Sequence, residues 1–275
     1  MAKITAAEVN NLRKITGAGM MDCKKALQES EGDVEKAIEI LRKKGQKVAS
    51  KRADKAANEG IVLAKTNDGK TFAAMVMVNC ETDFVAKNDD FVQFVHEITN
   101  AAIEKTPASL DELKGLDLNG RTIEENVMDQ IGKIGEKIEL NGYDFIKAEA
   151  TYAYNHMGNK LGAIVGFNKA GYDQVGKEIA MQIAAMNPVG IDKDDVAPEI
   201  IEKEIEIGKE QARQEGKPEA LLEKIATGKL NKFFKESTLL NQEFIREGKK
   251  SVKQYLEGVD KDLKIVKISR FILGD

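Results

Sequence analysis

Two stretches between residues 60 and 190 repeat the same order of elements, and this repeat constrains the fold more than any other feature. Each has an apolar strand, a turn, a second apolar strand and a helix with one apolar face. The first comprises 60–64, 67–69, 72–78 and a helix with Phe91, Phe94, Val95, Ile98 and Ala102. The second comprises 150–154, 157–159, 161–167 and a helix with Val175, Ile179, Ile183 and Met186. A hairpin followed by a helix, present twice, predicts two related subdomains of the α+β class.

Capping signals predict a three-helix unit over residues 5–45. Thr5 with Glu8 three residues later forms a capping box, so a helix should begin there. Asp33 is placed to cap the third helix. Gly45 follows the last apolar turn of that helix and is placed to end it. The stripe of buried residues expected in the first helix is Val9, Leu12 and Ile15.

The remaining segments complete a four-part organisation. Residues 198–236 predict an antiparallel helical hairpin with its break at 216–218. Residues 123–137 are expected to be helical, and 263–273 to form a final strand packed on the core. The first predicted part is a three-helix domain, 1–45, and the second is a charged linker, 46–59. Two core subdomains follow, 60–147 and 148–275. The second subdomain includes the helical hairpin and the carboxy-terminal segment.

Composition excludes several function classes. The chain has 275 residues and a net charge of −4, so it is a poor general binder of phosphate backbones and we expect no direct nucleic-acid partner. Its cysteines, Cys23 and Cys80, and its histidines, His96 and His156, lack metal-ligand spacing. No phosphate loop or nucleophile elbow occurs. We therefore expect no cofactor, no metal and no catalytic residues.

We expect a cytoplasmic protein without a membrane segment. The first residues lack the apolar core of a signal peptide. No run of about 18 apolar residues is long enough to cross a bilayer. Two cysteines far apart in sequence are typical of a reduced compartment.

The basic stretch 42–58 has two interpretations. It is either a solvated helix or tether, or a docking surface for an acidic partner or RNA. Its lysines and arginines are Arg42, Lys43, Lys44, Lys47, Lys51, Arg52 and Lys55. Against the RNA interpretation, no aromatic platform accompanies these residues.

Phe84 is the residue whose environment matters most for function. It follows the predicted strand 72–78 and precedes the polar stretch 86–90, so it lies at a strand-to-helix junction. Folds present side chains to partners at such junctions. The ring either folds back into the core or is left for another protein to bury, which would contribute about 1.5–3 kcal/mol.

Three segments resemble one protein family. Residues 12–27 are similar to the amino-terminal signature of bacterial translation elongation factor Ts. Residues 78–87, with Thr82-Asp83-Phe84-Val85, resemble a second signature, and residues 216–236 a third. The three segments occur in family order across nearly the whole chain.

The resemblance implies a function, a partner and a set of contact residues. It implies a guanine nucleotide exchange factor, not an enzyme, that binds elongation factor Tu in a one-to-one complex. The family fold has a ubiquitin-associated-like three-helix domain, a two-part core and a protruding coiled-coil hairpin. The implied partner-binding residues are Thr82, Asp83, Phe84 and Val85, which disturb the switch and magnesium region of the GTPase; Arg13, Met20, Met21 and Lys24 in the amino-terminal domain; and Ile134, Gly135 and His156 in the core.

One position departs from the family pattern. Gln182 stands where some relatives carry a histidine that contacts the partner. The resemblance therefore leaves the contact at this position in doubt.

Overall fold

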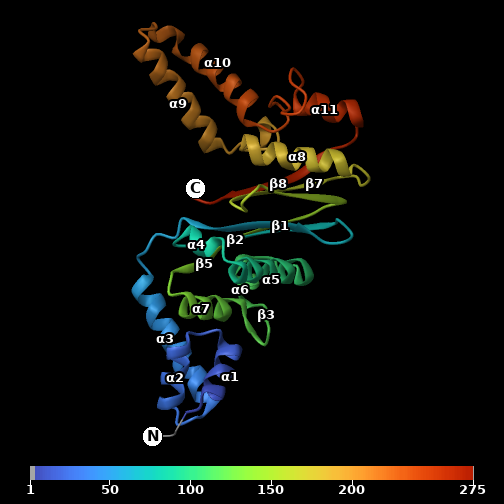
Figure 1. Ribbon diagram of the computed structural model, residues 1–275. Helices are drawn as coiled ribbons and strands as arrows, with labels where there is room; N and C mark the ends of the chain where they lie inside the picture. Colours follow the sequence, from blue (N-terminus) through green and yellow to red (C-terminus); the bar gives the residue numbers. More distant parts are fainter. Residues whose placement is uncertain (1–3, 275) are drawn as a thin grey trace.

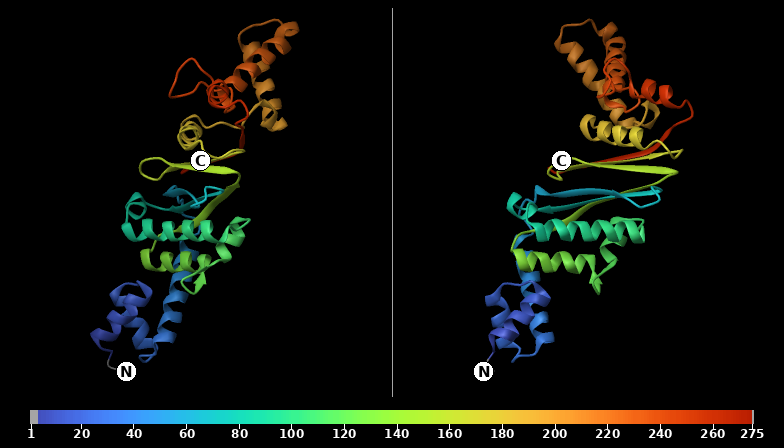
Figure 2. Two further views of the ribbon diagram at one scale, coloured as in Figure 1. Left: turned by 90° about the vertical axis from the view of Figure 1, so that its right-hand side faces the viewer. Right: turned by 45° about the vertical axis from the view of Figure 1, so that its right-hand side comes forward.

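Helices and sheets are stacked along the long direction of the molecule (Figure 1). The computed structural model describes residues 4–274, and its class is α+β. Three helices form one end, two packed sheets with outer helices form the middle, and a helical hairpin projects at the other end (Figure 2). None of the helices within residues 4–274 is long and apolar enough to cross a membrane. The expected lack of a signal core rests partly on Met1–Lys3, which lie outside the described residues.

The first helices begin where their capping residues predict. Thr5 and Glu8 form the expected capping box, and Asp33 caps the third helix. Val9 and Leu12 are buried between the helices, but the prediction for Ile15 is wrong, since 56% of it is exposed. Ile15 lies in the last turn before the helix ends, over a groove rather than a neighbouring helix. The helices are α1 (Ala6–Thr16), α2 (Met20–Glu29) and α3 (Val34–Arg52).

Gly45 does not end α3, which continues to Arg52. The glycine is buried where α3 crosses α7 (Ile123–Ile134), and a Cβ added there would lie 3.4 Å from the Cα of Gly132. The missing side chain allows two helices to approach closely. Residues 46–52, expected in the linker, are therefore the last turns of a helix that joins the amino-terminal helices to the core.

The first sheet is antiparallel with the strand order β1-β2-β5. It contains β1 (Glu59–Thr66), β2 (Phe72–Cys80) and β5 (Ile138–Lys147). One face packs against α5 (Asp89–Lys105) and α7, with buried rings from Phe91 and Phe94. Strand β5 was not predicted. A short α6 (Leu110–Gly115) and a small hairpin, β3 (Asp117–Leu118) with β4 (Arg121–Thr122), precede α7.

The second sheet repeats the plan with the order β6-β7-β8. Its strands are β6 (Ala150–Asn155), β7 (Leu161–Phe167) and β8 (Ile265–Ile272), and β8 confirms the final strand expected from the sequence. Helices α8 (Asp173–Met186) and α11 (Val252–Val259) cover its outer face (Figure 1). The inner faces of the two sheets pack through Val62, Met75, Ile146 and Ile164. The result is a four-layer core of helices, sheet, sheet and helices.

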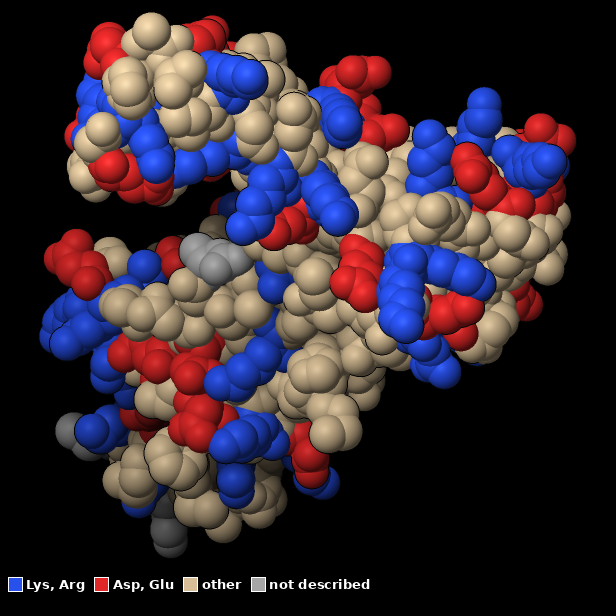
Figure 3. Space-filling model, turned by 90° about the horizontal axis from the view of Figure 1, so that it is seen from above, with Lys and Arg blue, Asp and Glu red and all other residues tan. Residues whose placement is uncertain are grey.

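The predicted helical hairpin is confirmed. It consists of α9 (Pro198–Gln214) and α10 (Glu219–Ser237), which follow a 3₁₀ turn, η1 (Lys193–Asp195). Small residues let the helices approach, because a Cβ at Gly208 would lie 3.1 Å from the Cα of Ala226. Figure 3 views the molecule from this end and shows a hollow bordered by the projecting hairpin, with side chains of both charge signs around it.

Candidate functional site

The junction after β2 is held by side chains from distant segments. Thr82 is the N-cap of α4 (Asp83–Ala86), and its hydroxyl donates to Oε1 of Glu136 at 2.8 Å. The backbone N–H of Thr82 donates to the other oxygen of the same carboxylate at 3.1 Å. Glu81, just before it, accepts hydrogen bonds from the Lys137 backbone N–H at 2.6 Å and from Arg52 at 2.8 Å. The start of α4 is therefore anchored to both α3 and the segment between α7 and β5.

Phe84 projects from this anchored helix into solvent. Its exposed fraction is 83%, whereas Val85 and Ala86 pack against the first core. The structure therefore decides between the two alternatives for the ring: Phe84 does not fold back into the core. Exposed apolar rings on a held backbone are typical of protein-binding sites, because a partner gains the burial energy without first ordering the helix.

Asp83 lies beside the ring and is charged at neutral pH. Its carboxylate accepts a hydrogen bond from Nζ of Lys87 at 2.6 Å. This hydrogen bond, then the charge of Lys87 and more weakly that of Lys160, lowers the pKa of Asp83 below its ordinary value. Asp83 is therefore an accessible hydrogen-bond acceptor for a partner.

The thiol of Cys80, below α4, is unreactive. Its Sγ donates to the carbonyl of Thr82 at 3.2 Å. Burial, with a contribution from the charge of Glu136, raises the pKa of this thiol to about 12. Within residues 4–274, no cluster of histidine, cysteine and acidic side chains is arranged to hold a metal ion.

A pocket of about 320 Å³ joins Phe84 to two other regions. Val85 and Ile134 line it from the core, and Gly17 lines it from the turn after α1. Gly135 follows as the left-handed cap of α7, with φ of 82°. The fold thus places Ile134 and Gly135, predicted from the resemblance, next to the junction.

The predicted amino-terminal residues lie on an exposed surface. Met20 and Met21 are exposed and line a second pocket of about 300 Å³ together with Lys24. Arg13 is exposed but does not line that pocket. In the part of the chain that the structure describes, neither Arg13 nor Lys24 forms an ion pair, so both are available to an acidic partner.

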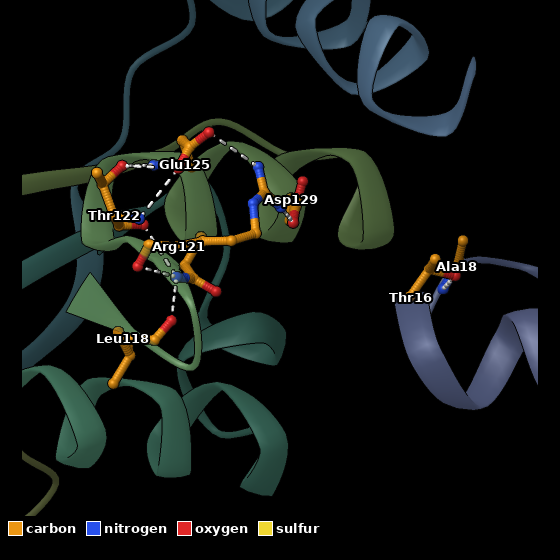
Figure 4. Close-up of polar contacts among 8 residues, drawn as sticks. Thr16, Ala18, Leu118, Arg121, Thr122, Glu125 and Asp129 are labelled. Atoms are coloured by element: carbon orange, nitrogen blue, oxygen red, sulfur yellow. Dashed lines mark hydrogen bonds and ion pairs between the residues drawn. The ribbon is translucent and has the colours of Figure 1, made fainter. Parts of the chain in front are cut away.

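A groove of about 500 Å³ lies between the end of α1 and α7, beside the crossing of α3 with α7. On the α7 side, Arg121 forms ion pairs with Asp129 and Glu125. Figure 4 shows this cluster, with Thr16 and Ala18 on the other side of the groove, at the end of α1 and in the turn after it. Because these ion pairs join the residue before α7 to two of its turns, we assign the cluster a structural role in α7.

Comparison with known proteins supplies the family. Residues 81–275 match the family described as Elongation factor TS. The chain is 52% identical over 279 residues to Elongation factor Ts of Cytophaga hutchinsonii, with all of both chains covered. It is 49% identical to Elongation factor Ts of Amoebophilus asiaticus, over 98% of this chain and 99% of that protein. Elongation factor Ts of Christiangramia forsetii is also 49% identical, with full coverage of both.

The chain belongs to the elongation factor Ts family.

In this member of the family, His156 lies in the turn between β6 and β7. It is exposed, and its Nδ1 lies 3.0 Å from the hydroxyl of Tyr154. The turn contacts the first strand of the other subdomain, where Lys160 forms an ion pair with Glu59 at 2.7 Å. Glu59 is paired with Cys80 at the end of β2, so the turn and the junction share one end of the stacked sheets.

The sequence analysis did not predict that Met157, the residue after His156, has an exposed side chain. It is 90% exposed, more than any other large apolar residue described. An apolar residue inside the polar turn 155–159 is a signal that could have identified it.

Gln182 is not available to a partner. It is fully buried, and its amide donates to Oε1 of Gln242 and to the carbonyl of Glu243. Its oxygen accepts from the backbone N–H of Ile245 at 2.9 Å. The doubt about a contact here is justified, because this side chain connects α8 to the loop after α10.

The basic stretch is partly helical and partly neutralised. Lys44 pairs with Asp22, Lys43 with Glu39 at 2.8 Å, and Arg52 with Glu81. These pairs reduce the positive charge that the segment offers to a phosphate backbone.

Proposed function

We propose that this protein is the guanine nucleotide exchange factor of elongation factor Tu. It binds the GDP-bound GTPase and promotes GDP release during translation elongation. The observation that carries this proposal is the exposed Phe84 ring on a helix whose start is tied to two other segments, α3 and the segment between α7 and β5. The family membership and the names of the relatives support it.

The mechanism follows from thermodynamic linkage. If the protein binds the nucleotide-free GTPase more tightly than the GDP-bound form, GDP must bind the complex more weakly by the same factor. Each tenfold of this coupling corresponds to about 1.4 kcal/mol. Burial of Phe84 contributes about 1.5–3 kcal/mol, or roughly one to two tenfold steps. It does so only if its pocket in the GTPase opens in the exchange-competent state, because equal binding to both states shifts nothing.

The neighbours of Phe84 have distinct roles in this mechanism. Thr82 holds the helix start, and Val85, the residue after Phe84, packs the helix against the core. Asp83 accepts hydrogen bonds from a rearranged switch region of the GTPase and thereby disturbs its magnesium site. The charged state of Asp83 suits this role, since a carboxylate accepts stronger hydrogen bonds than a neutral group.

The other predicted residues widen the contact. Arg13, Met20, Met21 and Lys24 dock on the GTPase from a domain of the ubiquitin-associated type, and the helical hairpin acts as a protruding coiled coil. Ile134, Gly135 and His156 extend the contact along one end of the core. Because two hairpin-plus-helix copies occur in one chain, we propose a one-to-one complex. The protein makes and breaks no bond of the nucleotide, so we class it as an exchange factor rather than an enzyme.

The proposal is tested by measuring whether GDP and this protein weaken each other's binding to elongation factor Tu. The affinity of the protein for elongation factor Tu is measured by calorimetry with the GTPase nucleotide-free and then with excess GDP. We expect much weaker binding with GDP, and an equal weakening of GDP binding when this protein is present. Equal affinity in the two nucleotide states would overturn the proposal.

A further inference from the structure

Two glutamates form a reciprocal pair at the base of α4. The carboxylate of Glu81 accepts from the backbone N–H of Lys137 at 2.6 Å. The carboxylate of Glu136 accepts from the backbone N–H of Thr82 at 3.1 Å. The segment after β2 and the segment before β5 therefore each supply a carboxylate that accepts from a backbone N–H of the other.

This pair continues the ladder between β2 and β5. The last backbone-paired residues of the two strands are Cys80 and Ile138. Beyond this pair the backbone ladder ends, and the carboxylates of Glu81 and Glu136 serve as acceptors in place of backbone carbonyls. Hydrogen bonds to charged acceptors are stronger than those between neutral groups, so the junction stays held after the sheet has ended.

Three more contacts fix the direction of α4. The hydroxyl of Thr82 donates to Oε1 of Glu136 and also accepts from the N–H of Val85 in the first turn of the helix. Arg52, at the end of α3, donates to Glu81. The side chain of Glu81 is only 13% exposed, so this ion pair is shielded from solvent more than most surface pairs.

We propose that Glu81 and Glu136 are positioning residues that hold α4 in the orientation that presents Phe84. We call the two residues the carboxylate clamp. Their consequence for nucleotide exchange rests on the function proposed above, whereas their effect on the ring is a property of this chain alone. A held ring gives up less conformational freedom on binding than a loose one, so the clamp preserves affinity.

The chain contains no tryptophan, which allows a direct test. The variant Phe84→Trp carries the only tryptophan of the chain, in the first turn of α4, and the anisotropy of its tryptophan fluorescence reports the local motion of the helix. In this background Glu136→Gln keeps the side-chain length but removes the negative charge, so the hydrogen bonds with the Thr82 N–H and hydroxyl lose their charge assistance. We expect lower anisotropy of Trp at position 84, well below the unfolding temperature. Glu257→Gln, an exposed glutamate on α11, is the matched control and should leave the anisotropy unchanged.

Two Thr82 variants separate positioning from simple stability. Thr82→Val removes the hydroxyl and should lower the anisotropy, whereas Thr82→Ser keeps the hydroxyl and should restore it. These variants also replace Glu136→Gln as the test if that variant fails to fold. An anisotropy that is the same in Glu136→Gln or Thr82→Val as in the parent, with both proteins folded, would overturn the clamp.

Exchange assays distinguish the clamp from the proposed function. Glu136→Gln in the otherwise natural chain should slow the GDP release it stimulates from elongation factor Tu by roughly tenfold. If the anisotropy falls while GDP release stays fast, the clamp is supported and the role of Phe84 in exchange is contradicted. If the anisotropy does not change, the clamp is contradicted whatever the exchange rate.

Discussion

The two hairpin-plus-helix copies use their strand-to-helix connections differently. In the first copy the connection after β2 is anchored at its base but leaves the Phe84 ring in solvent. In the second copy the side chains of the connection after β7 bind another segment of the same chain. The hydroxyl of Tyr172 donates to Asp260 at 2.6 Å, and Lys169 pairs with the same carboxylate at 2.8 Å. The shared topology does not require an exposed ring, so the exposure of Phe84 is a feature of the first copy alone.

In the second copy the buried polar side chains also form their hydrogen bonds within the chain. Gln182 and Gln242 form hydrogen bonds within α8 and the loop after α10. The comparison therefore predicts that changes at Gln182 and at the connection after β7 affect stability, whereas changes at the first junction affect exchange.

The largest effect on stability is expected from Gln182→Ala. The change leaves buried donors and acceptors without partners and should lower the free energy of unfolding by about 2–4 kcal/mol. Urea denaturation measures the loss. Gln174→Ala, exposed on the same helix, is the control and should change stability by about 0.5 kcal/mol or less. Slower GDP release by the folded Gln182→Ala protein would contradict the division between the copies.

The second prediction concerns pH and Asp260. The hydrogen bonds from Lys169 and then Tyr172 lower the pKa of Asp260 to about 2. Because the pKa is depressed relative to about 3.9 in the unfolded chain, the stabilisation is fully present above about pH 4 and is lost as the pH falls toward 2. The stability difference between the natural chain and Asp260→Asn should therefore shrink over this range. Urea midpoints at pH 6, 4 and 3 test it, and a constant difference would show that Asp260 is not the titrating group.

The smallest effect is expected from the amino-terminal surface. The double change Arg13→Ala and Lys24→Ala should slow association with elongation factor Tu by roughly three- to tenfold at low salt and much less at high salt. Lys253→Ala with Lys261→Ala removes equal charge beside the second copy and serves as the control. An equal loss at every ionic strength would argue against an electrostatic role for Arg13 and Lys24.

Local signals predicted most of the elements. Capping residues located the starts of α1 and α3, and alternating or continuous apolar runs located the four strands of the two hairpins. Strand β5 was missed because its alternation is interrupted after Gly142, beside a bulge at Asn141 of the same strand. Its pairing with β2 is long-range, and no local pattern encodes it.

Other features depend on contacts that the sequence does not show. Gly45 could end a helix or let another helix approach, and only its contact with Gly132 distinguishes the two. The sequence also does not show in which direction the Phe84 side chain points. Helix α4 has only four residues, and an apolar periodicity can be recognised only over more than one turn. The side chains that hold this direction, such as Glu136, lie more than fifty residues away in the chain.

The most direct measurement is the rate of GDP release from elongation factor Tu with Phe84→Ala, followed by stopped flow with a fluorescent GDP analogue. Val259→Ala, an exposed apolar residue at the end of α11, is the control for loss of apolar surface. The account predicts that Phe84→Ala slows release by roughly 10- to 100-fold, as loss of about 1.5–3 kcal/mol requires, while Val259→Ala leaves it unchanged. Release by a folded Phe84→Ala protein as fast as by the natural chain would contradict the account.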